Sequence, residues 1–135
     1  MYHLHFLNPE EEEMYELNLL KYLYSSKSVG KPIDSEELYF TYYNIASVLR
    51  KENKLKEALV YYLYAFITAS NGTYQGELDD CTYYISFIYS LLGNKNLAKR
   101  YLDLNLYLAN KLGNGSYTSY STLDHVKIIC MIQKI

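Results

Sequence analysis

The chain has 135 residues, half of them hydrophobic, and a formal net charge of −2 at neutral pH. A length of this order is typical of one domain, which buries about two thirds of the surface that its unfolded chain exposes. The high apolar content argues against a disordered chain, and the absence of a basic stripe argues against nucleic acid as a partner. We therefore expect one globular domain with a core of its own.

The first segment, 1–7, alternates apolar side chains with His3 and His5. Two histidines make only half of a zinc site, so we expect no metal here and a segment that packs its aromatic side chains onto the first helix. The segment lacks the basic region and the apolar core of a signal peptide, and no run of 18 apolar residues occurs in the chain. We therefore expect a cytoplasmic protein without a membrane span.

Residues 8–24 predict the first helix. Asn8 suits the N-cap, Pro9 suits the first turn, and the glutamates at 10–13 complement the positive end of the helix. We interpret these glutamates as a solvated first turn rather than as a partner site. Serine, glycine and proline at 25–32 then predict a loop.

Residues 38–69 predict two helices separated by a short polar break at 51–54. Residues that recur at helical spacings of three and four are Tyr42, Ile45, Ala46 and Leu49 in the first helix, and Ala58, Tyr62 and Ala65 in the second. Ala46 and Ala58 are small enough for two helix backbones to approach closely. We therefore expect these two alanines where the helices cross.

Capping and turn residues mark the helix ends. Asp34 or Ser35 is expected to cap the first helix of this pair, and the second is expected to end at 70–72, where glycine favours a left-handed conformation. Glycine and asparagine at 93–94 and a loop at 113–116 separate the later helices. The three further helices predicted are 74–92, 94–112 and 117–135.

This pair of helices resembles a tetratricopeptide repeat, whose pattern is Trp-x-x-Leu-Gly-x-x-Tyr, then Ala-x-x-x-Phe, then Pro. The residues that correspond to this pattern are Tyr42, Ile45, Ala46 and Leu49 for the first motif and Ala58 and Tyr62 for the second. The closing proline is absent, and Ser70 lies near its place. These residues only pack helices, so the resemblance indicates a fold more than a function.

The next two helices look like a second repeat. Ala98 corresponds to Ala58, and we call the separation of these two alanines along the chain the repeat offset. At the same offset, Ser86 corresponds to Ala46. The best-matching repeats are 39–72 and 79–114. The repeat offset exceeds the family's usual length of about 34 residues, which implies longer helices or a longer connection. In length the two repeats resemble those of bacterial peptide-sensing regulators.

The resemblance implies an all-α fold in one domain over 1–135: a tetratricopeptide-like α-solenoid of about six antiparallel helices in three pairs, wound into a short right-handed superhelix. The concave surface of such a solenoid, lined by first helices, commonly receives an extended peptide or a helix. The residues that this implies for partner binding are Tyr43, Asn44, Ser47, Arg50 and Lys51 in the first repeat, and Asp80, Tyr83, Tyr84 and Phe87 in the second. Burial under the sixth helix is the alternative for the three aromatic residues of the second set.

No catalytic chemistry is evident in the sequence. It contains neither a glycine-rich phosphate loop nor a His-Glu-x-x-His helix. His125 and Cys130 are five residues apart on one predicted helix and do not share a face. We therefore expect no enzyme, no cofactor and no metal, and we interpret Cys81 and Cys130 as two buried thiols of a reducing compartment.

Tyrosine is unusually common, with 18 residues, while tryptophan is absent. One explanation is a genome rich in A and T, whose codons favour tyrosine. The other is an aromatic groove, because tyrosine combines a flat apolar ring with a polar hydroxyl. Both explanations remain open.

Three functions fit this pattern. The leading hypothesis is a non-catalytic adaptor or scaffold that binds a protein or peptide, and the alternative is a peptide-sensing regulator whose output lies in another chain or domain. The third is a self-assembling scaffold, because the last helix is apolar on more than one side and such patches usually mark interfaces. The residues expected in a homodimer interface are Val126, Ile128, Ile129 and Ile132. The alternative is that the last helix folds back into the protein's own groove and occupies it.

Overall fold

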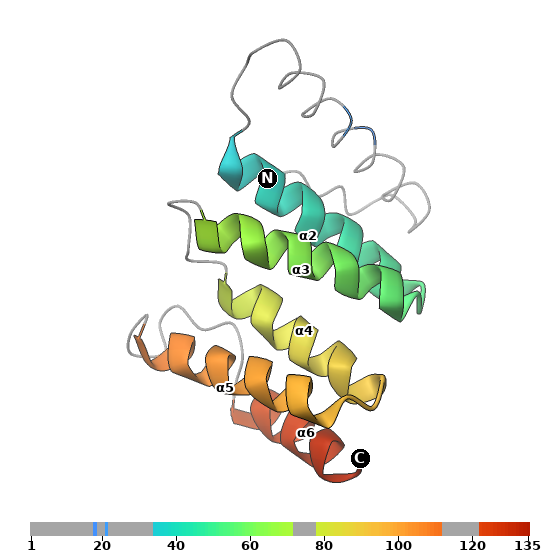
Figure 1. Ribbon diagram of the computed structural model, residues 1–135, viewed down its shortest axis with the longest axis vertical. Helices are drawn as coiled ribbons and strands as arrows, with labels where there is room; N and C mark the ends of the chain where they lie inside the picture. The colour runs from blue at the N-terminus through green and yellow to red at the C-terminus, as the bar shows by residue number, and fades with distance from the viewer. Residues whose placement is uncertain (1–17, 19–20, 22–33, 72–77, 112–121) are drawn as a thin grey trace. The chain divides into compact units, whose positions relative to one another are not determined.

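The computed structural model of the chain describes residues 18, 21, 34–71, 78–111 and 122–135. Five α-helices are labelled within the described ranges: α2 (Ser35–Lys51), α3 (Leu55–Asn71), α4 (Leu78–Leu91), α5 (Lys95–Lys111) and α6 (Thr122–Gln133) (Figure 1). No strand occurs in these ranges, so the all-α prediction is confirmed there. The N-terminal segment and all but two residues of the expected first helix lie outside the described residues.

The chain divides into two compact units, Met1–Tyr74 and Gln75–Ile135. In the first unit α2 packs against α3, and in the second α4 packs against α5 while α6 contacts both of them. Within each unit the two helices of the hairpin run in opposite directions (Figure 1).

Asp34 is the N-cap of α2, which settles the choice between the two capping residues expected from the sequence. Its side chain accepts a hydrogen bond of 2.9 Å from the backbone N–H of Glu36. The first turn carries Glu36 and Glu37, and the last turn carries Arg50 and Lys51. Both pairs of charges complement the helix dipole, so α2 is favoured locally at both ends.

The turn between α2 and α3 is a Schellman motif. Asn53 adopts a left-handed conformation with φ of 63°. Its N–H donates to the carbonyl of Arg50 at 2.9 Å, and the N–H of Lys54 donates to the carbonyl of Leu49 at 2.8 Å. These bonds satisfy the last carbonyls of α2 and fix where the chain turns back.

The turn between α4 and α5 repeats this motif at the repeat offset. Gly93 has φ of 82°. Its N–H donates to the carbonyl of Ser90 at 3.2 Å, and the N–H of Asn94 donates to the carbonyl of Tyr89 at 2.9 Å. The helices that follow, α3 and α5, each have 17 residues, and their first residues are also related by the repeat offset. The two hairpins therefore share one local design.

The same offset relates the residues at the helix crossings. Buried side chains at matching positions are Ile45 and Ile85, Ala46 and Ser86, Val48 and Ile88, and Ala58 and Ala98. In the second hairpin the Ser86 hydroxyl donates to the backbone carbonyl of Ala98 at 2.7 Å. A side-chain contact this short with the neighbouring backbone requires closely approaching helices, which is the reason that small residues occupy these positions.

The two cysteines differ in burial. Cys81 is buried in α4 as expected, but Cys130 is exposed on α6, so the prediction of two buried thiols is wrong for Cys130. The cause is that α6 buries only one face, which carries Ile128 and Ile132. None of the described helices is both long and apolar enough to cross a membrane.

Candidate functional site

The first set of residues expected to bind a partner lies on α2, and part of it holds α3. Tyr62 of α3 is fully buried, and its hydroxyl lies 3.1 Å from the hydroxyl of Ser47. The Nε–H of Arg50 donates to the same Tyr62 oxygen at 3.1 Å. Ser47 and Arg50 therefore hydrogen-bond a buried phenol whose hydroxyl must have partners.

Tyr43 continues this cluster through its ring. It stacks on Tyr39 with ring centroids 5.8 Å apart and meets Tyr62 edge to face at 5.5 Å. Asn44 is largely buried, whereas Lys51 is exposed at the end of α2. We use the name α2 surface for Tyr43, Ser47, Arg50 and Lys51, of which the lysine is the most accessible.

The second set lies on α4. Tyr83 is buried in a cluster with Ala98 and Leu102 of α5 and Ile128 and Ile132 of α6. Its position matches the alternative left open by the sequence, burial under the last helix. Of the four residues expected in a homodimer, Ile128 and Ile132 thus pack inside the second unit.

The remaining residues of this set are half-buried. The ring of Tyr84 meets those of Tyr83 and Phe87 edge to face, with centroids 5.3 and 6.5 Å apart. The Nζ of Lys127 lies 5.3 Å from the centroid of Phe87, a cation–π arrangement across α4 and α6. Asp80 is half-buried in the first turn of α4. Parts of Tyr84, Phe87 and Asp80 therefore remain exposed.

A buried polar network links the three helices of the second unit. The Nδ2 of Asn105 donates to the carbonyl of Asp79 at 2.6 Å and to the hydroxyl of Thr82 at 3.0 Å. Its Oδ1 lies 2.7 Å from Nε2 of His125. Because that oxygen only accepts, the proton of this hydrogen bond belongs to Nε2. The network anchors α6 to the α4–α5 hairpin.

This network was not predicted from the sequence, although one sign of it was present. At the repeat offset Asn105 of the second repeat corresponds to Ala65 of the first, so an amide replaces a methyl group at a core position. A fully buried amide requires hydrogen-bond partners. The identity of those partners depends on the fold and not on the spacing.

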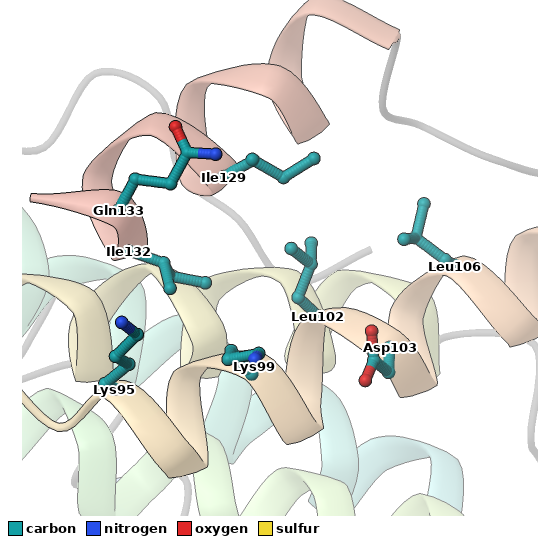
Figure 2. Close-up of a pocket in the computed structure, with 8 residues that line it drawn as sticks. All are labelled: Lys95, Lys99, Leu102, Asp103, Leu106, Ile129, Ile132 and Gln133. Atoms are coloured by element: carbon teal, nitrogen blue, oxygen red, sulfur yellow. The ribbon is translucent and has the colours of Figure 1, made fainter.

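A groove of about 350 Å³ runs between α5 and α6. Its lining residues are Lys95, Lys99, Leu102, Asp103, Leu106, Ile129, Ile132 and Gln133 (Figure 2). The leucines and isoleucines form an apolar floor, and the two lysines, the aspartate and the glutamine form a polar rim. Within the described part of the chain neither lysine forms an ion pair. The arrangement suits an apolar anchor flanked by a carboxylate.

No metal-binding group of three or more His, Cys, Asp or Glu side chains occurs among the described residues. His125 is buried and hydrogen-bonded to Asn105, while Cys130 is exposed. These two side chains therefore do not form a nucleophile and base pair. No protein-family model, no curated protein and no solved structure matches the chain.

Proposed function

We propose that the protein is a non-catalytic binding module of the tetratricopeptide type, which acts as an adaptor or scaffold for a protein or peptide. The observation that carries this proposal is the recurrence of one helical hairpin, with the same turn and the same small crossing residues, at the repeat offset. Repeated helical hairpins bury a continuous core by stacking, and the surface that they leave open serves recognition rather than chemistry.

The α2 surface is the proposed contact with a peptide. Tyr43 offers a flat aromatic ring, and Lys51 offers an exposed cation at the end of the helix. Arg50 donates through Nε to Tyr62 and helps to fix the position of this surface on α2. A peptide with a carboxylate opposite Lys51 and an apolar or aromatic side chain opposite Tyr43 fits this chemistry.

The experiment is a co-purification from the native host followed by affinity measurement with variants. Lys51→Glu reverses the exposed charge without removing a buried contact, and Lys56→Glu makes the same change on an exposed residue of α3. We expect the recovered protein or peptide to bind the parent and the Lys56→Glu variant equally, and Lys51→Glu more weakly. Equal affinity for all three proteins would remove the α2 surface from the proposal.

The second candidate partner is another copy of the same chain, bound through α6 in a homodimer. The observation that favours it is the exposure of Val126 and Ile129, with 44% and 39% of their surfaces accessible. Light scattering across a range of concentrations tests it, because a dimer would dissociate into monomers in the Val126→Glu variant. A monomer at every concentration would end this candidate.

The peptide-sensing regulator remains as an alternative within the same class. It is supported by the repeat length alone, which resembles that of bacterial regulators. A partner whose own activity changes when a peptide is added would favour it over a passive adaptor.

A further inference from the structure

The internal repeat shows which face of α6 is open. At the repeat offset, Val126 and Ile129 correspond to Ser86 and Tyr89 of α4. In α4 these positions face the second helix of the hairpin: Ser86 bonds the backbone of α5, and the ring of Tyr89 stacks on Tyr101 of α5 at 5.9 Å. In α6 the corresponding residues are partly exposed, whereas their neighbours Ile128 and His125 pack inward. The face of α6 that matches the hairpin contact of α4 is therefore apolar and uncovered.

We infer that this face of α6, with the groove beside it, is a docking site for one amphipathic helix of a separate partner protein, which packs as the second helix of a hairpin. This inference rests on the proposed binding function and names the class of partner. The partner helix runs antiparallel to α6, as α5 runs antiparallel to α4. Its apolar face covers Val126 and Ile129, and its edge enters the groove between α5 and α6.

The charges of the groove set the direction of the partner helix. Gln133 and Ile132 of α6 lie toward the Lys95 end of the groove, and Ile129 lies toward Leu102 (Figure 2). An antiparallel partner therefore begins near Lys95 and Lys99. The first turn of a helix favours acidic residues, and these would meet two lysines that have no ion pair with a described residue. The charge of the rim thus complements the end of the helix that arrives there.

The packing positions set the sequence of the partner helix. The second helices of the two hairpins carry a small residue, a large residue four positions later and a small or polar residue three further on: Ala58, Tyr62 and Ala65, and Ala98, Leu102 and Asn105. Because α6 has Val126 where the first helices have Ala46 and Ser86, the small residue must come from the partner. The expected pattern is an acidic first turn followed by Ala-x-x-x-Leu-x-x-Ala.

A second copy of α6 fits this face less well. Its sequence contains no alanine, glycine or serine, and the smallest side chain on its exposed side is Cys130, whose thiol is larger than the methyl or hydroxymethyl group at the hairpin crossings. Two copies would place valine and isoleucine side chains against each other where the hairpins place a methyl or hydroxymethyl group. The geometry thus favours a different protein as the partner.

The test uses a fluorescein-labelled synthetic helix that begins with three glutamates and carries the Ala-x-x-x-Leu-x-x-Ala pattern, with anisotropy at low salt as the readout. We expect saturable binding to the full chain. The double change Val126→Glu and Ile129→Glu should weaken it at least about tenfold, because two buried apolar contacts become charged. The control Ile67→Glu alters an exposed isoleucine of α3 and should leave the affinity unchanged.

A charge exchange tests the direction of the helix. The double change Lys95→Glu and Lys99→Glu should lower the affinity for the glutamate peptide about fivefold, since each exposed pair contributes modestly. It should raise the affinity for a peptide with three lysines in its first turn. The control Arg100→Glu changes a charge of α5 that does not line this groove. Equal binding of both peptides by parent and variants would overturn the proposed orientation and the site.

The oligomeric state of the protein distinguishes the two possible occupants of this face, a partner helix and a second copy of the chain. A parent protein that is monomeric and binds the peptide supports the inference. The inference would be overturned by a parent dimer that the peptide does not dissociate and that the double change Val126→Glu and Ile129→Glu converts to monomers. If the peptide fails to bind while Lys51→Glu still weakens a recovered partner, this inference fails and the proposed binding function stands.

Discussion

The side-chain oxygen of Asn105 lies 2.7 Å from Nε2 of His125, and this hydrogen bond joins α5 to α6 inside the second unit. Asn105 is almost fully buried, and its amide also reaches the carbonyl of Asp79. One side chain therefore satisfies polar groups from two other helices. The first hairpin has an alanine at the corresponding position, so the network is a feature of the second unit and not of the repeat.

The first prediction concerns this amide. Asn105→Ala introduces the residue of the first repeat and should lower the free energy of unfolding by about 1–3 kcal/mol, because it leaves His125 and the Asp79 carbonyl without this partner. Urea denaturation followed by circular dichroism measures the change. Asn96→Ala, an exposed position of the same helix, is the control, and an equal effect of the two substitutions would show that the buried network adds no stability.

The second prediction concerns the helix crossing of the first hairpin. Ala46 and Ala58 are fully buried, and enlarging either to leucine should cost about 1–3 kcal/mol because the added atoms overpack a close contact. Val60→Leu enlarges a side chain of α3 that is 44% exposed and should be nearly neutral. A leucine variant at position 46 or 58 that unfolds at the same urea concentration as the parent would contradict the repeat register.

The third prediction compares two substitutions of one glycine. Gly93 has φ of 82°, and a Cβ added there meets no atom within 4 Å, so only the backbone opposes a side chain. Gly93→Ala should cost about 1 kcal/mol, the penalty of a left-handed conformation for an ordinary residue. Gly93→Asn should cost less, because asparagine already occupies this position of the motif as Asn53. Thermal unfolding gives the order, and the reverse order would mean that the turn rearranges.

The fourth prediction concerns the phenol of Tyr62. Tyr62→Phe should lower stability, since it removes the partner of Ser47 and of Arg50 while keeping the ring. The loss should be about 1 kcal/mol, the usual net value of such hydrogen bonds. Tyr64→Phe, on a half-exposed tyrosine of the same helix, provides the comparison. Equal shifts of the urea midpoint in the two variants would show that the Tyr62 hydroxyl adds no stability through its contacts with the α2 surface.

Several features of the fold could be predicted from local sequence. The spacing of Ala58 and Ala98 indicated the offset that relates the hairpins, and Gly93 and Asn94 marked a turn that the structure contains. These predictions succeeded because helix periods, small crossing residues and left-handed turn residues act within a few positions of the chain.

Other features depend on which residues meet in space. The resemblance to the repeat family implies that Ser47 and Arg50 lie on the expected binding face, yet it does not show that both reach the hydroxyl of Tyr62 on the next helix. The exposure of Cys130 was missed because α6 is apolar on several sides, and its sequence does not say which side packs. The partners of Asn105 lie far from it along the chain, where spacing carries no information.

The proposed function requires that the protein bind a partner without changing it chemically. An isothermal titration of the full chain with the partner recovered from its host, followed by mass spectrometry of the mixture, measures both properties. We predict saturable binding, an unaltered partner mass, and a loss of affinity of about fivefold in Lys51→Glu but not in Lys56→Glu. A partner that is converted to a product would contradict the proposed function, and binding that no α2 variant weakens would remove the α2 surface from it.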